Sequence, residues 1–260
     1  MRYFAGSALF HYLGPSFAVL LFARVDVLGV AWMRIAAAAA VFAIWRRPWR
    51  EFDRLVVALG CVLAVMNACF YLAIDRLPLA TVAAIEFIGP VALALIGVRT
   101  LRNVAAVAVA ALGVYLLTHV QFVGDPAGVA FAFANAVLFT AYIVLAHRVS
   151  RRRAVDGLAA AMLVAFVAVS PIGLDAAAHA IGDPVAIAAG IGVGISSSVI
   201  PYVLDQKAMA RLERSTYALF VALLPAFAVV IGAVVLTQIP SGADLAGIAL
   251  VMTAVGVHQP

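Results

Sequence analysis

Two oppositely charged side chains each lie deep inside a long apolar stretch of the sequence. Glu86 lies seven residues after the start of the apolar run 79–98, and Arg34 lies seven after the start of the run 27–45. At a helical rise of 1.5 Å per residue, each lies about 10 Å from the end of its run. Charges in apolar surroundings usually mark a ligand or ion path. We expect Glu86 to be the only carboxylate well inside such a run.

Two asparagines extend this pair into a layer. Asn67 lies seven residues before the end of the run 55–74, and Asn135 lies seven after residue 128, where another run starts. If residue 1 lies in the cytoplasm and each run crosses the membrane once, all four side chains share one depth below the outer face. Four helices are therefore expected to form one polar layer.

The chemistry of Arg34 and Glu86 fits a zwitterion. An amino acid carries a carboxylate for the guanidinium and an ammonium for the carboxylate, so the two charges are complementary to both ends of such a substrate. Two alternatives stay open. The pair can form a buried salt bridge that only joins two helices, or Glu86 can carry the coupling proton.

Five further side chains are weaker candidates. Tyr71 and Tyr142 either line the cavity with hydroxyls or anchor the helices at the membrane interface. Pro90 and Pro225 interrupt the helical hydrogen bonds, either at a transport site or as static kinks. His11 is either a proton relay or a structural hydrogen-bonding group.

A stripe of small residues marks a helix contact. Gly190, Gly194 and Ser198 follow one another at four-residue spacing, which is typical of helices that approach closely. We interpret this stripe as packing; the alternative is that the serines at 196–198 bind substrate, although serine can bond its own helix instead.

The elements that must position these residues are membrane-spanning helices. Of the 260 residues, 67% are hydrophobic and 11% are charged, far from the balance of soluble domains. A helix crosses a bilayer with about 20 apolar residues. The sequence therefore predicts an all-α polytopic membrane protein with ten transmembrane helices. The apolar runs are 4–22, 27–45, 55–74, 79–98, 104–120, 128–146, 158–174, 185–203, 216–236 and 243–257.

The positions of the basic residues predict the orientation. With residue 1 in the cytoplasm, the inner segments hold 14 of the 17 lysines and arginines, and the outer loops hold only Arg24 and Arg76. This bias predicts a multi-pass protein with both termini cytoplasmic. The cluster at 148–153 is interpreted as a topology anchor and not as a lipid-headgroup or nucleic-acid site. The partners expected for the protein as a whole are membrane lipid and a small-molecule substrate, and no nucleic acid.

Sequence signals of other chemistry are missing. The chain has no Gly-x-x-x-x-Gly-Lys-Ser/Thr loop, no His-Glu-x-x-His motif and no cluster of His and Cys ligands. We therefore expect no catalytic residue, no metal and no cofactor. An intramembrane hydrolase built from His11 and the serines at 196–198 is a distant alternative.

The sequence contains an internal repeat. Residues 73–97 align without gaps on residues 208–232, with eight of 25 positions identical. The matches include Arg76 with Arg211, Thr81 with Thr216, and Pro90 with Pro225. Because five predicted spans separate the copies, the halves are expected to be inverted in the membrane.

Three segments carry a family resemblance. Residues 33–52, 67–97 and 197–228 resemble the EamA group of the drug/metabolite transporter superfamily, and within it the inner-membrane threonine/homoserine exporters. The resemblance implies two inverted five-helix repeats, 1–122 and 123–260, around a central cavity. It implies export of small amino acids or related metabolites by alternating access in the inner membrane, driven by a proton gradient.

The same fold leaves other functions and assemblies open. The nearer alternative functions are a multidrug or cation exporter and a lipid translocator. A homodimer is an open alternative for the assembly. A cation exporter should need Glu86 and tolerate loss of Arg34, whereas a zwitterion carrier should need both. The chain departs from the resemblance at Leu224 and Gln238, where related exporters often carry glutamates.

Overall fold

The computed structural model describes residues 2–86, 88–89, 125–180, 182–211 and 224–257, with isolated positions between 100 and 116. All regular elements of this part of the chain are helices. In chain order they are α1 (Arg2–Leu21), α2 (Val27–Arg46), α3 (Arg54–Ile74), α4 (Leu79–Glu86), α7 (Pro126–Ser150), α8 (Ala154–Ala178), α9 (Pro184–Gly194), η1 (Ile195–Val199), α10 (Ile200–Met209), α12 (Leu224–Leu236) and α13 (Gly242–Val257).

Wherever the structure describes them, the predicted apolar runs are helical, and the helix of the run 185–203 continues to Met209. Five are long and apolar enough to cross a membrane, and the last of them joins α9, η1 and α10 into one span of 26 residues. The second half of the run 79–98 and most of the run 104–120 lie outside the described residues. The protein is a multi-pass membrane protein. The five spans are Val27–Arg46, Arg54–Ile74, Pro126–Ser150, Ala154–Ala178 and Pro184–Met209.

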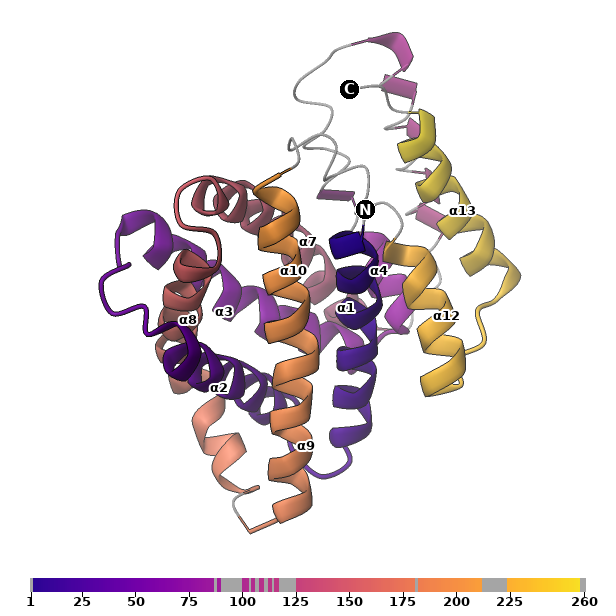
Figure 1. Ribbon diagram of the computed structural model, residues 1–260. Coiled ribbons are helices and arrows are strands. Elements are labelled where there is room, and N and C mark those ends of the chain that lie inside the picture. Colours follow the sequence, from indigo (N-terminus) through magenta and orange to yellow (C-terminus); the bar gives the residue numbers. More distant parts are fainter. Residues whose placement is uncertain are drawn as a thin grey trace.

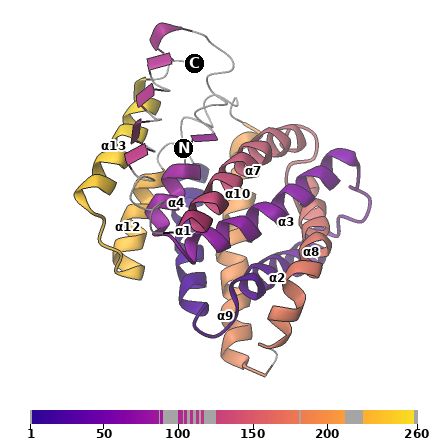
Figure 2. The same cartoon turned by 180° about the vertical axis from the view of Figure 1, so that it is seen from behind.

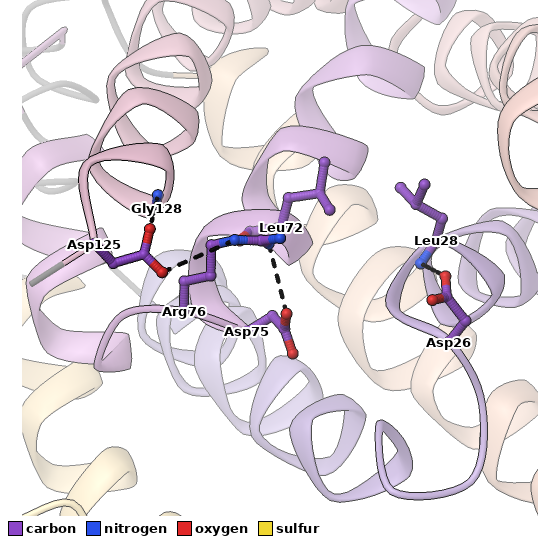
Figure 3. Close-up of polar contacts among 7 residues, drawn as sticks. All are labelled: Asp26, Leu28, Leu72, Asp75, Arg76, Asp125 and Gly128. Atoms are coloured by element: carbon purple, nitrogen blue, oxygen red, sulfur yellow. Dashed lines mark hydrogen bonds and ion pairs between the residues drawn. The ribbon is translucent and has the colours of Figure 1, made fainter.

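Aspartates start several of these helices. Asp125 accepts a hydrogen bond of 2.8 Å from the amide of Gly128 at the start of α7, and Asp26 accepts one of 2.9 Å from Leu28 in α2 (Figure 3). Asp53 caps α3 and Asp183 caps α9 in the same way. Each carboxylate satisfies an amide that lacks a helical partner.

The two arginines expected in outer loops lie beside carboxylates. Arg76 lies 3.5 Å from Asp75 and 3.9 Å from the Asp125 cap (Figure 3), and Arg24 lies 2.9 Å from Asp183. All of these side chains are partly exposed, so each pair contributes little energy. Two of them join different loops, Arg76 with Asp125 and Arg24 with Asp183.

The described helices form one bundle. In Figure 1, α1 lies alongside the α9–η1–α10 span, with α12 and α13 on one side and α2, α3 and α8 on the other. The opposite view shows α3 crossing close to α7 and α8 (Figure 2). Further contacts join α2 to α8, α2 to α9, α4 to α7, α1 to α12 and α4 to α12.

The small-residue stripe packs against α2. A Cβ atom at Gly194 would lie 2.6 Å from the Cβ of Ala37 and 2.7 Å from the carbonyl oxygen of Arg34, and one at Gly190 would overlap Met33. The expected close helix contact is therefore confirmed. It brings η1, which follows Gly194 directly, against the turn of α2 that carries Arg34.

Candidate functional site

The α9–η1–α10 span contains a local irregularity at its centre. Residues Ile195–Val199 form a π turn, in which the amide of Ile200 bonds the carbonyl of Ile195, five residues back. Pro201 follows and has no N–H to donate to the carbonyl of Ser197, its i−4 partner. Such π turns are frequent at functional sites because they change which backbone groups are paired.

Arg34 uses this irregularity. Its Nη2 donates to the carbonyl of Ser197 at 2.7 Å, and its Nε donates to the hydroxyl of Ser198 at 2.7 Å. The guanidinium carbon lies 5.4 Å from the ring centre of Tyr71 and 5.9 Å from that of Tyr202. Arg34 is 4% exposed. A buried cation is thus held by neutral oxygens and two aromatic faces.

Glu86 has a separate set of partners. The Nδ2 of Asn135 donates to its Oε1 at 2.9 Å, and the hydroxyl of Tyr12 lies 3.4 Å from its Oε2 in hydrogen-bonding geometry. Glu86 is 4% exposed, and Asn135 and Tyr12 are fully buried. The carboxylate is therefore bound by one side chain from α7 and one from α1.

The two charges do not pair with each other. Among the ion pairs of the described residues, none joins Arg34 and Glu86. The structure consequently differs from the alternative in which a direct salt bridge joins α2 and α4. Each charge is held by neutral hydrogen-bonding groups.

The predicted polar layer is only partly assembled. Asn135 bonds Glu86, whereas Asn67 is buried and donates to the carbonyl of Leu63 in its own helix at 2.7 Å. Asn67 also lies beside Tyr202, whose hydroxyl is 3.5 Å from Nη2 of Arg34, so it reaches Arg34 only indirectly, and no direct hydrogen bond between described residues joins it to either charge. The sequence predicts how deep in the membrane a side chain lies. It does not predict which neighbour that side chain faces.

Both predicted tyrosines lie inside the bundle. Tyr71 faces Arg34, and the ring of Tyr142 packs 5.5 Å from that of Tyr202 and 5.8 Å from that of Phe139. Tyr71 and Tyr142 are fully buried, unlike anchors at a membrane surface. Tyr71 therefore lies directly at Arg34, whereas Tyr142 reaches Arg34 only through the ring of Tyr202.

His11 lies between the two groups of partners. Its ring contacts those of Tyr12, Phe139 and Tyr202 edge-on, with centroid distances of 5.6, 6.0 and 6.3 Å. Tyr12 is a partner of Glu86 and Tyr202 a partner of Arg34. The imidazole therefore links the two charged groups through aromatic contacts.

The two predicted helix breaks are described unequally. Pro90 lies outside the described residues. Pro225 is the second residue of α12 as described, and residues 212–223 before it also lie outside.

The expectation that Glu86 is the only carboxylate well inside a span is wrong. The helix does not end at residue 203 but continues to Met209, and Asp205 is buried within it, 2% exposed. The apolar run stops at Asp205 by composition, although the backbone hydrogen bonds continue. Helical spacing would have found this residue, because Tyr202, Asp205 and Gln206 share one face. Sequence reasoning also missed Tyr12 and Tyr202.

Comparisons with known proteins agree with this architecture. Residues 126–257 match the EamA-like transporter family. The threonine/homoserine exporter RhtA of Escherichia coli (strain K12) is 30% identical over 253 residues, with 93% of this chain and 84% of that protein covered. RhtA of Salmonella typhimurium (strain LT2) is 29% identical with the same coverage.

A solved structure shares the fold. This crystal structure superposes on the chain with a TM-score of 0.64 at 20% sequence identity. The match covers 96% of this chain and 93% of that one.

Proposed function

Because this chain belongs to the EamA-like transporter family, we propose that it exports small amino acids of the threonine and homoserine type, or related metabolites, across the inner membrane. Its relatives are transporters and not enzymes, and several of its helices are long enough to cross a membrane. Membership of the family supports a membrane exporter of small metabolites. The class of substrate must be inferred from the side chains of the site.

The observation that carries the substrate class is the separation of Arg34 from Glu86. Both are buried, both are held by neutral donors and acceptors, and neither neutralises the other. Charges removed from water are costly unless a partner charge compensates them. A zwitterion whose carboxylate meets Arg34 and whose ammonium meets Glu86 compensates both at once.

The proposed architecture is ten helices in two inverted repeats, 1–122 and 123–260. Several helix contacts support it, because they occur in matching pairs when each span is exchanged for the one five positions along. The contact of α3 with α7 has its counterpart in α1 with α10, that of α3 with α8 in α2 with α9, and that of α4 with α7 in α1 with α12. Two helices contact their own counterparts, α2 with α8 and α4 with α12. Such an arrangement suits alternating access by rocking of the two halves.

We infer a proton gradient as the energy source and a cytoplasmic position for both termini. The resemblance to the threonine/homoserine exporters supports the first point, and the bias of basic residues supports the second. Labelling with a membrane-impermeant maleimide tests the orientation in a variant without Cys61 and Cys69. Gly182→Cys should react in intact cells and Arg50→Cys only after permeabilisation; the reverse pattern would refute the orientation.

Counterflow in proteoliposomes tests the substrate class. Vesicles loaded with unlabelled L-threonine or L-homoserine should accumulate the labelled amino acid from outside. Arg34→Gln and Glu86→Gln should each abolish this uptake, while Arg50→Gln, an exposed arginine changed in the same way, should retain it. Retention of uptake by Arg34→Gln together with export of organic cations would instead identify a cation exporter. If none of the amino acids shows counterflow, the proposal is refuted.

A further inference from the structure

The first helix binds two buried carboxylates and not one. Tyr12 of α1 contacts Glu86, and Ser7, five residues earlier on α1, donates to Oδ1 of Asp205 at 2.5 Å. The Ser7 hydroxyl also lies 3.3 Å from the carbonyl of Pro201. Glu86 and Asp205 are the buried carboxylates of the described residues. The bundle therefore holds a second anionic centre that the zwitterion site does not use.

Polar groups around Asp205 lack hydrogen-bond partners. Gln206 is fully buried, and within the described part of the chain neither its Oε1 nor its Nε2 is hydrogen-bonded. The hydroxyl of Tyr142, from α7, is also buried and without a partner there. Tyr202 connects them, because Asp205 and Gln206 follow it by three and four residues and its ring packs on that of Tyr142.

These groups together define a ligand chemistry. The carboxylate of Asp205 favours a cation, the amide of Gln206 needs both a donor and an acceptor, and the phenol of Tyr142 can serve as either. Protonation of Asp205 would neutralise its charge and add one O–H donor, which is too few to satisfy both ends of the Gln206 amide and the phenol of Tyr142. A small polar molecule that carries an ammonium group satisfies all three.

We propose that Asp205, Gln206 and Tyr142 form a second substrate site, which takes the ammonium end of an amino acid. This proposal rests on the proposed function and adds a second binding position on the same path. Ser7 is one hydrogen-bond donor to the carboxylate in this structure, and the ammonium replaces that hydroxyl when the site is filled.

The two sites follow each other along one helix. Asp205 lies seven residues beyond Ser198, which is about 10 Å along the axis. Tyr202 lies between them, with its ring 5.9 Å from the guanidinium carbon of Arg34 and 5.5 Å from the ring of Tyr142. In the proposed orientation the second site is the nearer one to the cytoplasm, so an exported amino acid meets it first.

Binding stoichiometry of the purified protein tests the proposal. The wild-type protein should bind two molecules of labelled L-threonine per chain, and Asp205→Asn and Glu86→Gln should each bind one. Asp175→Asn is the matched control, because Asp175 is an exposed carboxylate of α8, and it should bind two. A wild-type stoichiometry of one, or two in Asp205→Asn, would overturn the second site.

Gln206→Leu separates binding from folding. The change removes two unbonded buried polar atoms at similar volume, so the thermal midpoint should stay the same or rise while the second L-threonine is lost. If Asp205→Asn does not fold, the loss of the second L-threonine is measured in Gln206→Leu and Tyr142→Phe instead.

Two other outcomes have distinct meanings. If Asp205→Asn and Gln206→Leu bind two molecules but lose only transport driven by a pH gradient, Asp205 carries a proton and the proposal fails. If the wild-type protein binds no amino acid at all, the proposed function fails as well.

Discussion

Arg34 donates a hydrogen bond of 2.7 Å to the carbonyl oxygen of Ser197. Pro201, four residues further on, has no N–H and so cannot donate to this oxygen. A guanidinium needs several acceptors when it leaves water. The π turn of the partner helix provides one of them from the backbone and, through Ser198, one from a side chain. The helix irregularity and the buried charge thus depend on each other.

Pro201→Ala should weaken the site without weakening the fold. Alanine restores an N–H that competes with Arg34 for the carbonyl of Ser197. A hydrogen bond to a charged group contributes about 1.5–3 kcal/mol, so the affinity for L-threonine should fall about tenfold or more. Isothermal titration measures this affinity, and thermal unfolding in detergent should show an unchanged or higher midpoint.

The control for this change is Pro184→Ala, an exposed proline in the first turn of α9. It should bind L-threonine as the wild type does. Equal affinities in the two variants would show that the carbonyl of Ser197 is not needed to position Arg34.

Asn135→Leu should reduce activity more than Tyr12→Phe. The bond from Asn135 to Glu86 is 2.9 Å long, whereas that from Tyr12 is 3.4 Å and close to the limit of an effective hydrogen bond. Removing the shorter bond should lower the affinity for L-threonine by about tenfold, and removing the longer one by about threefold or less. The opposite order would contradict the assignment of Asn135 as the main partner of Glu86.

Gly194→Ala should destabilise the bundle by about 1–3 kcal/mol, because the added methyl group would overlap Ala37 and the backbone of Arg34. Gly192→Ala on the same helix meets nothing within 4 Å and should be neutral or stabilising by up to about 1 kcal/mol. Unfolding midpoints in detergent compare the two variants. A stable Gly194→Ala variant would mean that α9 and α2 lie further apart than described.

Asp183→Ala should change the acid sensitivity of the fold. The backbone hydrogen bond from Ala186, together with the one from Arg24, lowers the pKa of Asp183 below its ordinary value. A carboxyl group whose pKa is lower in the folded state contributes stability above its unfolded pKa, and this contribution is lost as the pH falls through the folded pKa.

Thermal midpoints as a function of pH measure this effect. The wild type should exceed Asp183→Ala at pH 7, and the difference should shrink below about pH 4. Asp175→Ala, at an exposed position inside α8, provides the control. A difference that stays constant down to pH 2 would exclude the charge of Asp183 as its cause.

Much of the helical architecture was predictable from apolar length and charge bias. The five long spans begin and end within a few residues of the predicted runs, apart from the one that continues past residue 203 to Met209. Composition ends a run at the first polar cluster, but a helix ends where its hydrogen bonds end. Asp205 was missed for this reason.

The partners of the charges were less predictable. Depth placed Arg34, Glu86, Asn67 and Asn135 in one layer, but side-chain rotation about each helix axis decided the contacts, and it turned Asn67 back onto Leu63. The acceptors of Arg34 depend on a π turn. The spacing of apolar residues along the sequence does not predict such a turn.

Ser7 and Tyr12 are five residues apart on α1, which is about 7.5 Å along the helix axis. A shift or rotation of α1 therefore changes the contacts of both Glu86 and Asp205, which belong to different halves of the chain. In the proposed second site, an ammonium group that displaces Ser7 from Asp205 acts on the helix that also holds Tyr12 at Glu86. Binding at one carboxylate should therefore change the affinity at the other, and α1 is the element that couples them.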